Sequence, residues 1–157
     1  MAKKSTNILI IYTGGTIGMK VDAASGALAP FDFKQIEKQV PELQRFGCNI
    51  ETYQFDPIID SADMSPKIWT ELVNLIKNNY AKYDGFVILH GSDTMSYTAS
   101  ALSFMLQDLQ KPVILTGSQL PIGVLRTDGK ENLITAIEIA ADKLVNGDPV
   151  VPEVCIF

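Results

Sequence analysis

The chain has 157 residues, of which 46% are hydrophobic, and a formal net charge of −5. This amount of apolar material is enough for one folded domain with a sizeable core, and we expect a single domain over residues 1–157. The excess of acidic residues argues against nucleic acids and anionic membrane surfaces as partners, because proteins bind these polyanions through an excess of positive charge.

The N-terminal segment does not have the pattern of a targeting sequence. Its basic start is followed by an apolar run of only five residues, 8–12, which is too short for a signal peptide. No later stretch is long enough to span a bilayer. The single histidine and the distant Cys48 and Cys155 form no metal-ligand cluster. We therefore expect a soluble, cytoplasmic protein without a metal site, in which both cysteines are buried, reduced thiols.

Short apolar runs alternate with segments of helical periodicity along the chain. The apolar runs predict strands at residues 8–12, 48–55, 85–90, 112–116 and 150–157. The segments between them predict helices at residues 31–43, 66–80, 95–109 and 129–145. Pro41 lies inside the first of these helices. The second has a typical start, because Ser65 is a capping residue type and Pro66 is favoured at the first helical position.

The alternation of strands and helices predicts a doubly wound α/β fold with a mostly parallel sheet covered by helices on both faces. The continuous apolar run at residues 86–89 fits a strand that is buried on both sides. This three-layer α/β/α arrangement is flavodoxin-like. With a strand order of 2-1-3-4-5, a ligand would bind between the first and third strands, at their carboxyl ends.

The loop after the first strand has the residues of a ligand-binding turn. Residues 13–18 read Thr-Gly-Gly-Thr-Ile-Gly, and glycines allow the backbone to turn tightly and approach a ligand closely. Thr13 and Thr16 each place a hydroxyl where the strand leaves the sheet, so each is a candidate nucleophile. An ordinary glycine-rich turn would have the same composition.

Two further polar loops are expected at the same edge of the sheet. Residues 60–64 read Asp-Ser-Ala-Asp-Met, and residues 90–95 read His-Gly-Ser-Asp-Thr-Met. Their serines can donate hydrogen bonds to a carboxylate, and their aspartates can accept from an ammonium group. The side chains concerned are Asp60, Ser61, Ser92 and Asp93. Both kinds of partner in one site fit a zwitterion, such as an amino acid, better than a dinucleotide.

Two residues of these loops have structural alternatives. His90 ends a buried strand, and we interpret it as a hydrogen-bonded structural group rather than a catalytic base. A Ser-His-Asp triad cannot be assembled with confidence from one histidine. Asp93 could instead cap the following helix.

The two loop motifs resemble those of a known enzyme family. Residues 13–18, together with residues 84–95 (Asp-Gly-Phe-Val-Ile-Leu-His-Gly-Ser-Asp-Thr-Met), are similar to the two signature motifs of bacterial-type L-asparaginases. Residues 97–106, 111–119 and 126–133 resemble the cytoplasmic type I branch. The resemblance implies that residues 1–157 are the N-terminal α/β domain, and that the smaller C-terminal domain of the intact protein is absent.

The resemblance implies three catalytic residues. Thr16 would be the nucleophile that attacks the side-chain carboxamide of L-asparagine, releases ammonia and leaves an aspartyl ester for water to hydrolyse. Ser92 would position or activate the attacking group, and Asp93 would hold the substrate ammonium group. No cofactor is implied, and L-aspartate would be the product.

The resemblance also implies a substrate-binding set and an assembly. Asp60, Ser61 and Ala62 match the segment that binds the α-carboxylate and amine, together with Ser92 and Asp93. Ser118 matches a residue whose backbone lines the pocket. Family sites are built between subunits, which implies a homodimer or homotetramer for the full-length protein.

The chain departs from the family pattern at three places. Position 92 is usually threonine, and Ser92 keeps the hydroxyl without the methyl group that restricts its rotamer. Residues 25–30 contain no tyrosine, where many members place a partner for the nucleophile. The family's catalytic lysine would follow Phe157, and Lys130 and Lys143 are interpreted as surface residues. Residues 1–157 alone are therefore expected to be nearly inactive.

Two alternatives remain open, a related amidase and a protein of a different functional class. The glutamine-amidase subunit of a tRNA-dependent amidotransferase shares these motifs. A non-catalytic module that binds amino acids would use the same glycine-rich loops without a nucleophile.

Overall fold

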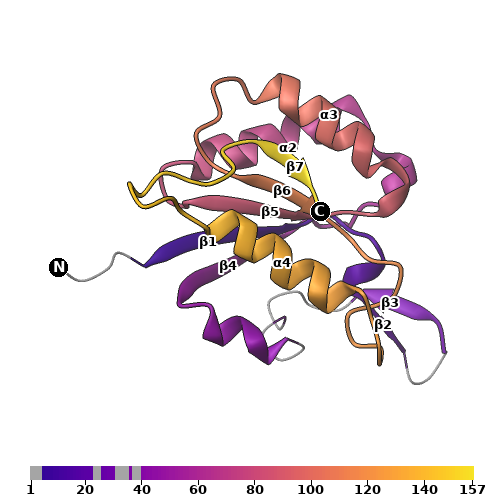
Figure 1. Ribbon diagram of the computed structural model, residues 1–157. Coiled ribbons are helices and arrows are strands. Elements are labelled where there is room, and N and C mark those ends of the chain that lie inside the picture. The colour runs from indigo at the N-terminus through magenta and orange to yellow at the C-terminus, as the bar shows by residue number, and fades with distance from the viewer. Residues whose placement is uncertain (1–4, 23–25, 31–35, 37–39) are drawn as a thin grey trace.

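The computed structural model describes residues 5–22, 26–30, 36 and 40–157. Within these residues, the main sheet has five parallel strands in the order β4-β1-β5-β6-β7 (Figure 1). In chain order the strands are β1 (Thr6–Tyr12), β4 (Cys48–Gln54), β5 (Gly85–Leu89), β6 (Val113–Thr116) and β7 (Val154–Ile156). This arrangement confirms the predicted doubly wound α/β fold and its strand order.

Helices cover both faces of the sheet (Figure 1). Helices α2 (Pro66–Asn79) and α3 (Met95–Met105) pack on one face, and α4 (Gly129–Ala141) packs on the other. Because side chains alternate along a strand, β1 contributes to both cores. Leu9 and Ile11 pack with α2 and α3, whereas Ile8 and Ile10 pack with α4.

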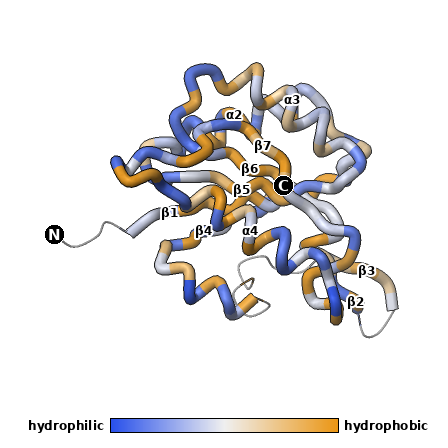
Figure 2. The backbone as a smooth tube through the Cα atoms, in the orientation of Figure 1, coloured by the Kyte–Doolittle hydropathy of each residue, from blue (hydrophilic) through white to orange (hydrophobic). Residues whose placement is uncertain are grey.

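The apolar character of the strands agrees with their burial. Figure 2 shows hydrophobic residues concentrated along the central strands, and every residue of β5 is buried. The edge strand β4 instead alternates half-buried and exposed residues. Cys48 and Cys155 are free thiols, as expected, but they are only half-buried because they lie in the two edge strands.

Several element ends differ from the sequence-based expectation. The structure ends α3 at Met105 and α4 at Ala141, each a few residues before the predicted end. Strand β7 begins only at Val154, after Pro152, which cannot donate to a ladder. Within the predicted helix 31–43, residues 31–35 and 37–39 lie outside the described residues. The sequence there continues into a 3-10 helix at Pro41–Arg45.

Short elements at the carboxyl ends of the strands were not predicted. A hairpin forms from β2 (Met19–Val21) and β3 (Leu28–Pro30), in a segment for which no strand was predicted. Each of the three polar loops also contains one 3-10 turn, at Thr16–Gly18, Ser61–Asp63 and Ser92–Thr94. Three residues are too few for a periodic signal. None of the helices in the described part of the chain has the length and apolar character needed to cross a bilayer.

Candidate active site

Backbone hydrogen bonds tie the three polar loops together at the carboxyl edge of the sheet. The N–H of Ile59 donates to the carbonyl of Thr13 at 2.7 Å, and the N–H of Thr13 donates to the carbonyl of Leu89 at 3.1 Å. The Thr94 hydroxyl donates to the carbonyl of Ser61 at 2.6 Å, which joins the second loop to the third. The loops therefore form one connected unit rather than three separate turns.

Glycines allow these loops to approach one another closely. Gly15 has φ of 91°, and a Cβ added there would lie 2.7 Å from the backbone nitrogen of Gly91. A Cβ added at Gly91 would lie 2.5 Å from Oγ of Ser61. Any other residue at either position would force neighbouring backbone or side-chain atoms to move. The glycines of the predicted motifs are therefore required by loop packing.

A cavity of about 420 Å³ lies between the loops. It contains five of the seven predicted site residues, namely Thr16, Asp60, Ser61, Ser92 and Asp93, together with Gly15, Met19, Ile58, Ile59 and Gly91. The cavity thus brings hydroxyl groups and carboxylates from three loops into one space.

The two candidate threonines have different environments. Thr13 is completely buried, and its hydroxyl donates to the carbonyl of Leu89 at 2.8 Å. Thr16 is half-buried and lines the cavity. Of these two residues, only Thr16 lines a space that a ligand could enter.

Asp60 and Asp93 are presented by 3-10 turns. Asp60 precedes Ser61–Asp63, and its Oδ1 accepts a hydrogen bond from the N–H of Ala62 at 3.0 Å. Ala62 itself is outside the cavity lining. Asp93 lies in the turn before α3, whose N-cap is Thr94, so the alternative role of Asp93 as the cap of that helix is wrong.

His90 is fully buried directly after β5. Its Nδ1 lies 2.7 Å from the carbonyl oxygen of Gly91, and its Nε2 lies 2.9 Å from the hydroxyl of Thr98. Burial lowers the pKa of His90, and the hydrogen bond to Gly91 opposes this only in part. The interpretation of His90 as a hydrogen-bonded structural group is therefore confirmed.

Ser118 lies beside the cavity rather than in its lining. Its hydroxyl donates to the carbonyl of Leu120 at 2.6 Å, within the loop that leads to α4. The neighbouring Gln119 contacts a residue of the lining, since its Nε2 donates to Oγ of Ser92 at 3.4 Å. Gln119 was not predicted, because a glutamine after a strand carries no distinctive signal.

Asp128 holds this loop in place and was not predicted either. Its carboxylate accepts from the backbone N–H groups of Gln119 at 2.8 Å and Leu120 at 3.0 Å. Burial alone would raise the pKa of Asp128, but these and other backbone hydrogen bonds outweigh it and lower the pKa. The position of Asp128 just before a predicted helix could have drawn attention to it. That position, however, indicates helix capping rather than hydrogen bonds to the backbone of a neighbouring loop.

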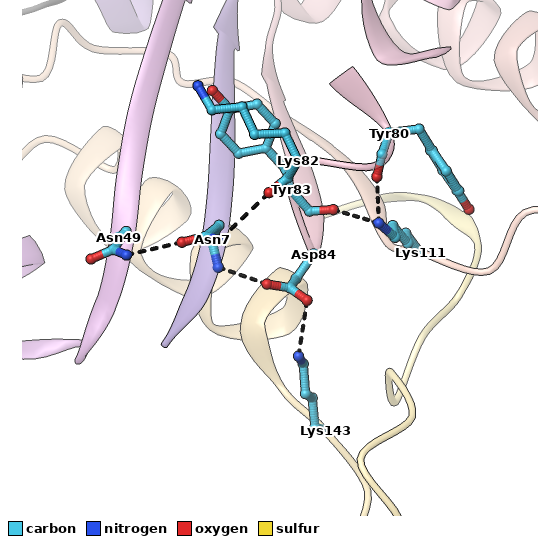
Figure 3. Close-up of polar contacts among 8 residues, drawn as sticks. All are labelled: Asn7, Asn49, Tyr80, Lys82, Tyr83, Asp84, Lys111 and Lys143. Carbon is cyan, nitrogen blue, oxygen red and sulfur yellow. Dashed lines mark hydrogen bonds and ion pairs between the residues drawn. The ribbon is translucent and has the colours of Figure 1, made fainter. Parts of the chain in front are cut away.

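Lys143 lies at the opposite edge of the sheet from the cavity. Its Nζ is 3.2 Å from Oδ1 of Asp84, the residue before β5, and Asp84 also accepts from the N–H of Asn7 at 2.8 Å (Figure 3). Lys143 is therefore a surface residue, as predicted, and it forms an ion pair with Asp84. Among the described residues, no group of three or more histidine, cysteine or acidic side chains could hold a metal ion.

A family model that matches nearly the whole chain shows that this doubly wound domain belongs to the asparaginase family. The family model described as "Asparaginase, N-terminal" matches residues 7–157. The chain is 48% identical over 147 residues to L-asparaginase 1 of Escherichia coli, covering 93% of this chain and 43% of that protein.

A solved structure and a second relative extend this similarity. The crystal structure of L-asparaginase I from Vibrio cholerae has a TM-score of 0.82 and 46% identity, covering 98% of this chain and 44% of that one. A glutamyl-tRNA(Gln) amidotransferase subunit of Pyrococcus horikoshii is 40% identical over 136 residues, or 85% of this chain and 31% of that protein. The chain thus spans less than half the length of these relatives.

Proposed function

We propose that the chain is the nucleophile-bearing N-terminal domain of a type I L-asparaginase, an amidohydrolase that converts L-asparagine and water to L-aspartate and ammonia. The observation that carries this proposal is the shared cavity, which collects Thr16, Asp60, Ser61, Ser92 and Asp93 from three separate loops. Its volume of about 420 Å³ is near the lower end of the range for small-molecule sites, as a single amino acid requires.

The arrangement supports binding of a zwitterion. The carboxylates of Asp60 and Asp93 would accept hydrogen bonds from the substrate ammonium group, and the hydroxyl of Ser61 would donate to the α-carboxylate. Ala62 and the backbone of Ser118 would complete the binding set from just outside the described lining. Contacts at both charged groups would orient the side-chain amide toward Thr16.

The chemistry would proceed by nucleophilic catalysis at Thr16. Its Oγ attacks the carboxamide carbon while its proton is removed, and the nitrogen leaves as ammonia after gaining a proton. The resulting aspartyl ester is hydrolysed by water, which restores the threonine hydroxyl and yields L-aspartate. Ser92 would position the attacking group, because its hydroxyl lies in the same cavity as Thr16.

The same proposal includes the setting of the reaction. The enzyme would act in the cytoplasm without a cofactor, as a homodimer or homotetramer of the full-length protein, and without nucleic-acid or membrane partners. The acidic net charge of −5 supports the last point, because it disfavours polyanionic surfaces.

Substitution of the nucleophile in the full-length protein tests the proposal. Thr16→Ala should reduce ammonia release from L-asparagine by at least about a thousandfold, because it removes the attacking atom. Thr16→Ser is the matched control that retains a hydroxyl and should retain measurable turnover. L-Aspartate should still bind to the alanine variant, as measured by calorimetry. Undiminished turnover by Thr16→Ala would contradict the assignment.

The similarity to the glutamyl-tRNA(Gln) amidotransferase chain supports a second candidate, a glutamine amidase that supplies ammonia to a partner. A larger kcat/KM for L-glutamine than for L-asparagine, rising further when a partner protein is added, would favour it. Tight binding of either amino acid without ammonia release by the wild-type protein would favour the non-catalytic binding module.

A further inference from the structure

A chain of buried and partly buried hydrogen bonds leads from the α2–α3 face of the sheet to the third loop of the cavity. Trp69 in α2 donates its indole N–H to Oγ1 of Thr98 in α3 at 3.0 Å. Thr98 Oγ1 lies 2.9 Å from Nε2 of His90, whose Nδ1 lies 2.7 Å from the carbonyl oxygen of Gly91. The chain therefore joins two helices to the residue that precedes Ser92.

The direction of each hydrogen bond follows from the groups involved. A carbonyl oxygen can only accept a hydrogen bond, so Nδ1 of His90 is protonated and donates to the carbonyl of Gly91. In a neutral imidazole Nε2 is then an acceptor, so the hydroxyl of Thr98 donates to it. That hydroxyl oxygen is left to accept from the indole of Trp69. All three bonds are satisfied at once in this one arrangement.

Gly91 lies where neighbouring loops are packed closely together. A Cβ added at Gly15 would lie 2.7 Å from the nitrogen of Gly91, and one added at Gly91 would lie 2.5 Å from Oγ of Ser61. A Cβ added at Gly117 would collide with the carbonyl oxygen of His90. Because the space around it is full, a rotation of the peptide after Gly91 would displace Ser92 and the facing loops together.

We propose that His90 is a positioning residue, which fixes the Gly91 carbonyl through Nδ1–H and thereby holds Ser92 and Asp93 opposite Thr16. This inference deepens the proposed function and rests on it. His90 is completely buried and outside the cavity lining, so it acts through Gly91 rather than on the substrate.

Two substitutions at position 90 separate its two hydrogen bonds in the full-length protein. His90→Asn places an amide N–H close to the place of Nδ1 and can still donate to Gly91, whereas His90→Gln reaches toward Thr98 and leaves Gly91 without its donor. A displacement of a reacting group by about 1 Å costs on the order of a hundredfold in rate. We therefore expect kcat to fall by about ten- to a hundredfold in His90→Gln and by less than about threefold in His90→Asn.

Trp69→Phe and Thr98→Val provide the matched controls. Each removes a hydrogen bond of the same chain but leaves the His90–Gly91 bond in place. Each should therefore lower the thermal unfolding midpoint, while kcat stays close to the wild-type value. If all four variants lose kcat only in proportion to their loss of folded protein, or if His90→Gln retains wild-type kcat, the positioning role is overturned.

A spectroscopic readout keeps the test independent of turnover. In ¹⁵N NMR the His90 imidazole, assigned by the loss of its signals in His90→Asn, should show the Nδ1–H tautomer. The Nε2–H tautomer would overturn the inference even in an active enzyme. Absence of ammonia release from the wild-type protein, with the Nδ1–H tautomer present and weaker L-aspartate binding by His90→Gln, would instead refute the proposed function and retain the positioning role.

Discussion

The hydroxyls of Thr13 and Thr16 are close in sequence but differ in what they contact. The hydroxyl of Thr13 donates a buried hydrogen bond to the carbonyl of Leu89, whereas Thr16 lines the cavity. The composition of the loop made both side chains candidates, and only the family resemblance assigned the nucleophile to Thr16. Thr13 directly follows the last residue of β1 and remains inside the sheet, whereas Thr16 begins the 3-10 turn. These positions decide which of the two residues lines the cavity.

Valine substitutions should separate the two roles. Thr13→Val removes a buried hydrogen bond and should lower the free energy of unfolding by about 1 kcal/mol, while the folded protein keeps its kcat. Thr16→Val should abolish ammonia release with little change in unfolding. Urea titration and the turnover assay measure the two quantities. A loss of kcat in folded Thr13→Val would contradict this division.

Gly15 should tolerate no side chain. Its φ of 91° and the 2.7 Å approach to Gly91 act together, so Gly15→Ala should cost at least about 2 kcal/mol of unfolding free energy. Gly26→Ala is the matched control, because Gly26 has φ of 69° but no atom within 4 Å of an added Cβ. It should cost only about 1 kcal/mol. Equal losses in urea unfolding would show that packing at Gly15 is unimportant.

Tyr12 makes stability sensitive to alkaline pH. Burial raises its pKa to about 12, above the value of about 10 for an unfolded tyrosine. The folded state thus keeps the phenol proton to a higher pH than the unfolded state does. The resulting contribution to the free energy of unfolding is complete below about pH 10 and is lost as the pH rises toward 12. Tyr12→Phe should flatten the dependence of unfolding free energy on pH over this window, and an unchanged slope would assign the effect elsewhere.

Among the helices and strands, a polar cluster joins the amino ends of the strands to the end of α2 (Figure 3). Lys111, two residues before β6, donates from Nζ to the carbonyls of Tyr80 and Tyr83, the latter at 2.7 Å. Its Nζ also lies 4.7 Å from the centre of the Tyr80 ring. One cation thereby satisfies the carbonyl of Tyr80, the C-cap residue of α2, and the carbonyl of Tyr83 just beyond the helix.

Lys111→Met should therefore destabilise the fold by about 1–3 kcal/mol, since it leaves these carbonyls without a charged donor. Lys82→Met is the control, because the Lys82–Glu51 pair has side chains that are 58% and 55% exposed, and exposed ion pairs contribute little to stability. Thermal unfolding compares the two. Neither variant should alter kcat, and a larger loss for Lys82→Met would contradict this account.

Features of the helices and strands divide into those that periodicity can predict and those that it cannot. Helix α2 was predicted from its apolar spacing and its Ser65-Pro66 start, and its bounds agree within one residue. The 3-10 turn at Ser92–Thr94 and the hairpin strand Met19–Val21 are too short to establish a period. Contacts such as Asp128 with Gln119 depend on tertiary folding, which no local pattern contains.

Across the domain, strand order decides where the chemistry can occur. Because β1 lies between β4 and β5, the loops that follow these three strands meet at one edge. The predicted order was therefore sufficient to bring Thr16, Ser61 and Ser92 together before any side-chain detail was known. The cavity volume, the exclusion of Ala62 from its lining and the role of Gln119 required three-dimensional packing to be resolved.

The polar cluster around Lys111 and the cavity around Thr16 occupy opposite rims of the same sheet. Substitutions at the amino ends of the strands can therefore change the thermal unfolding midpoint, while the geometry of the cavity at their carboxyl ends is preserved. An engineer seeking a hardier variant would direct mutagenesis to the neighbourhood of Asn7, Lys82 and Lys111. The glycine-packed rim offers no such freedom, because almost any added atom there disturbs several loops simultaneously.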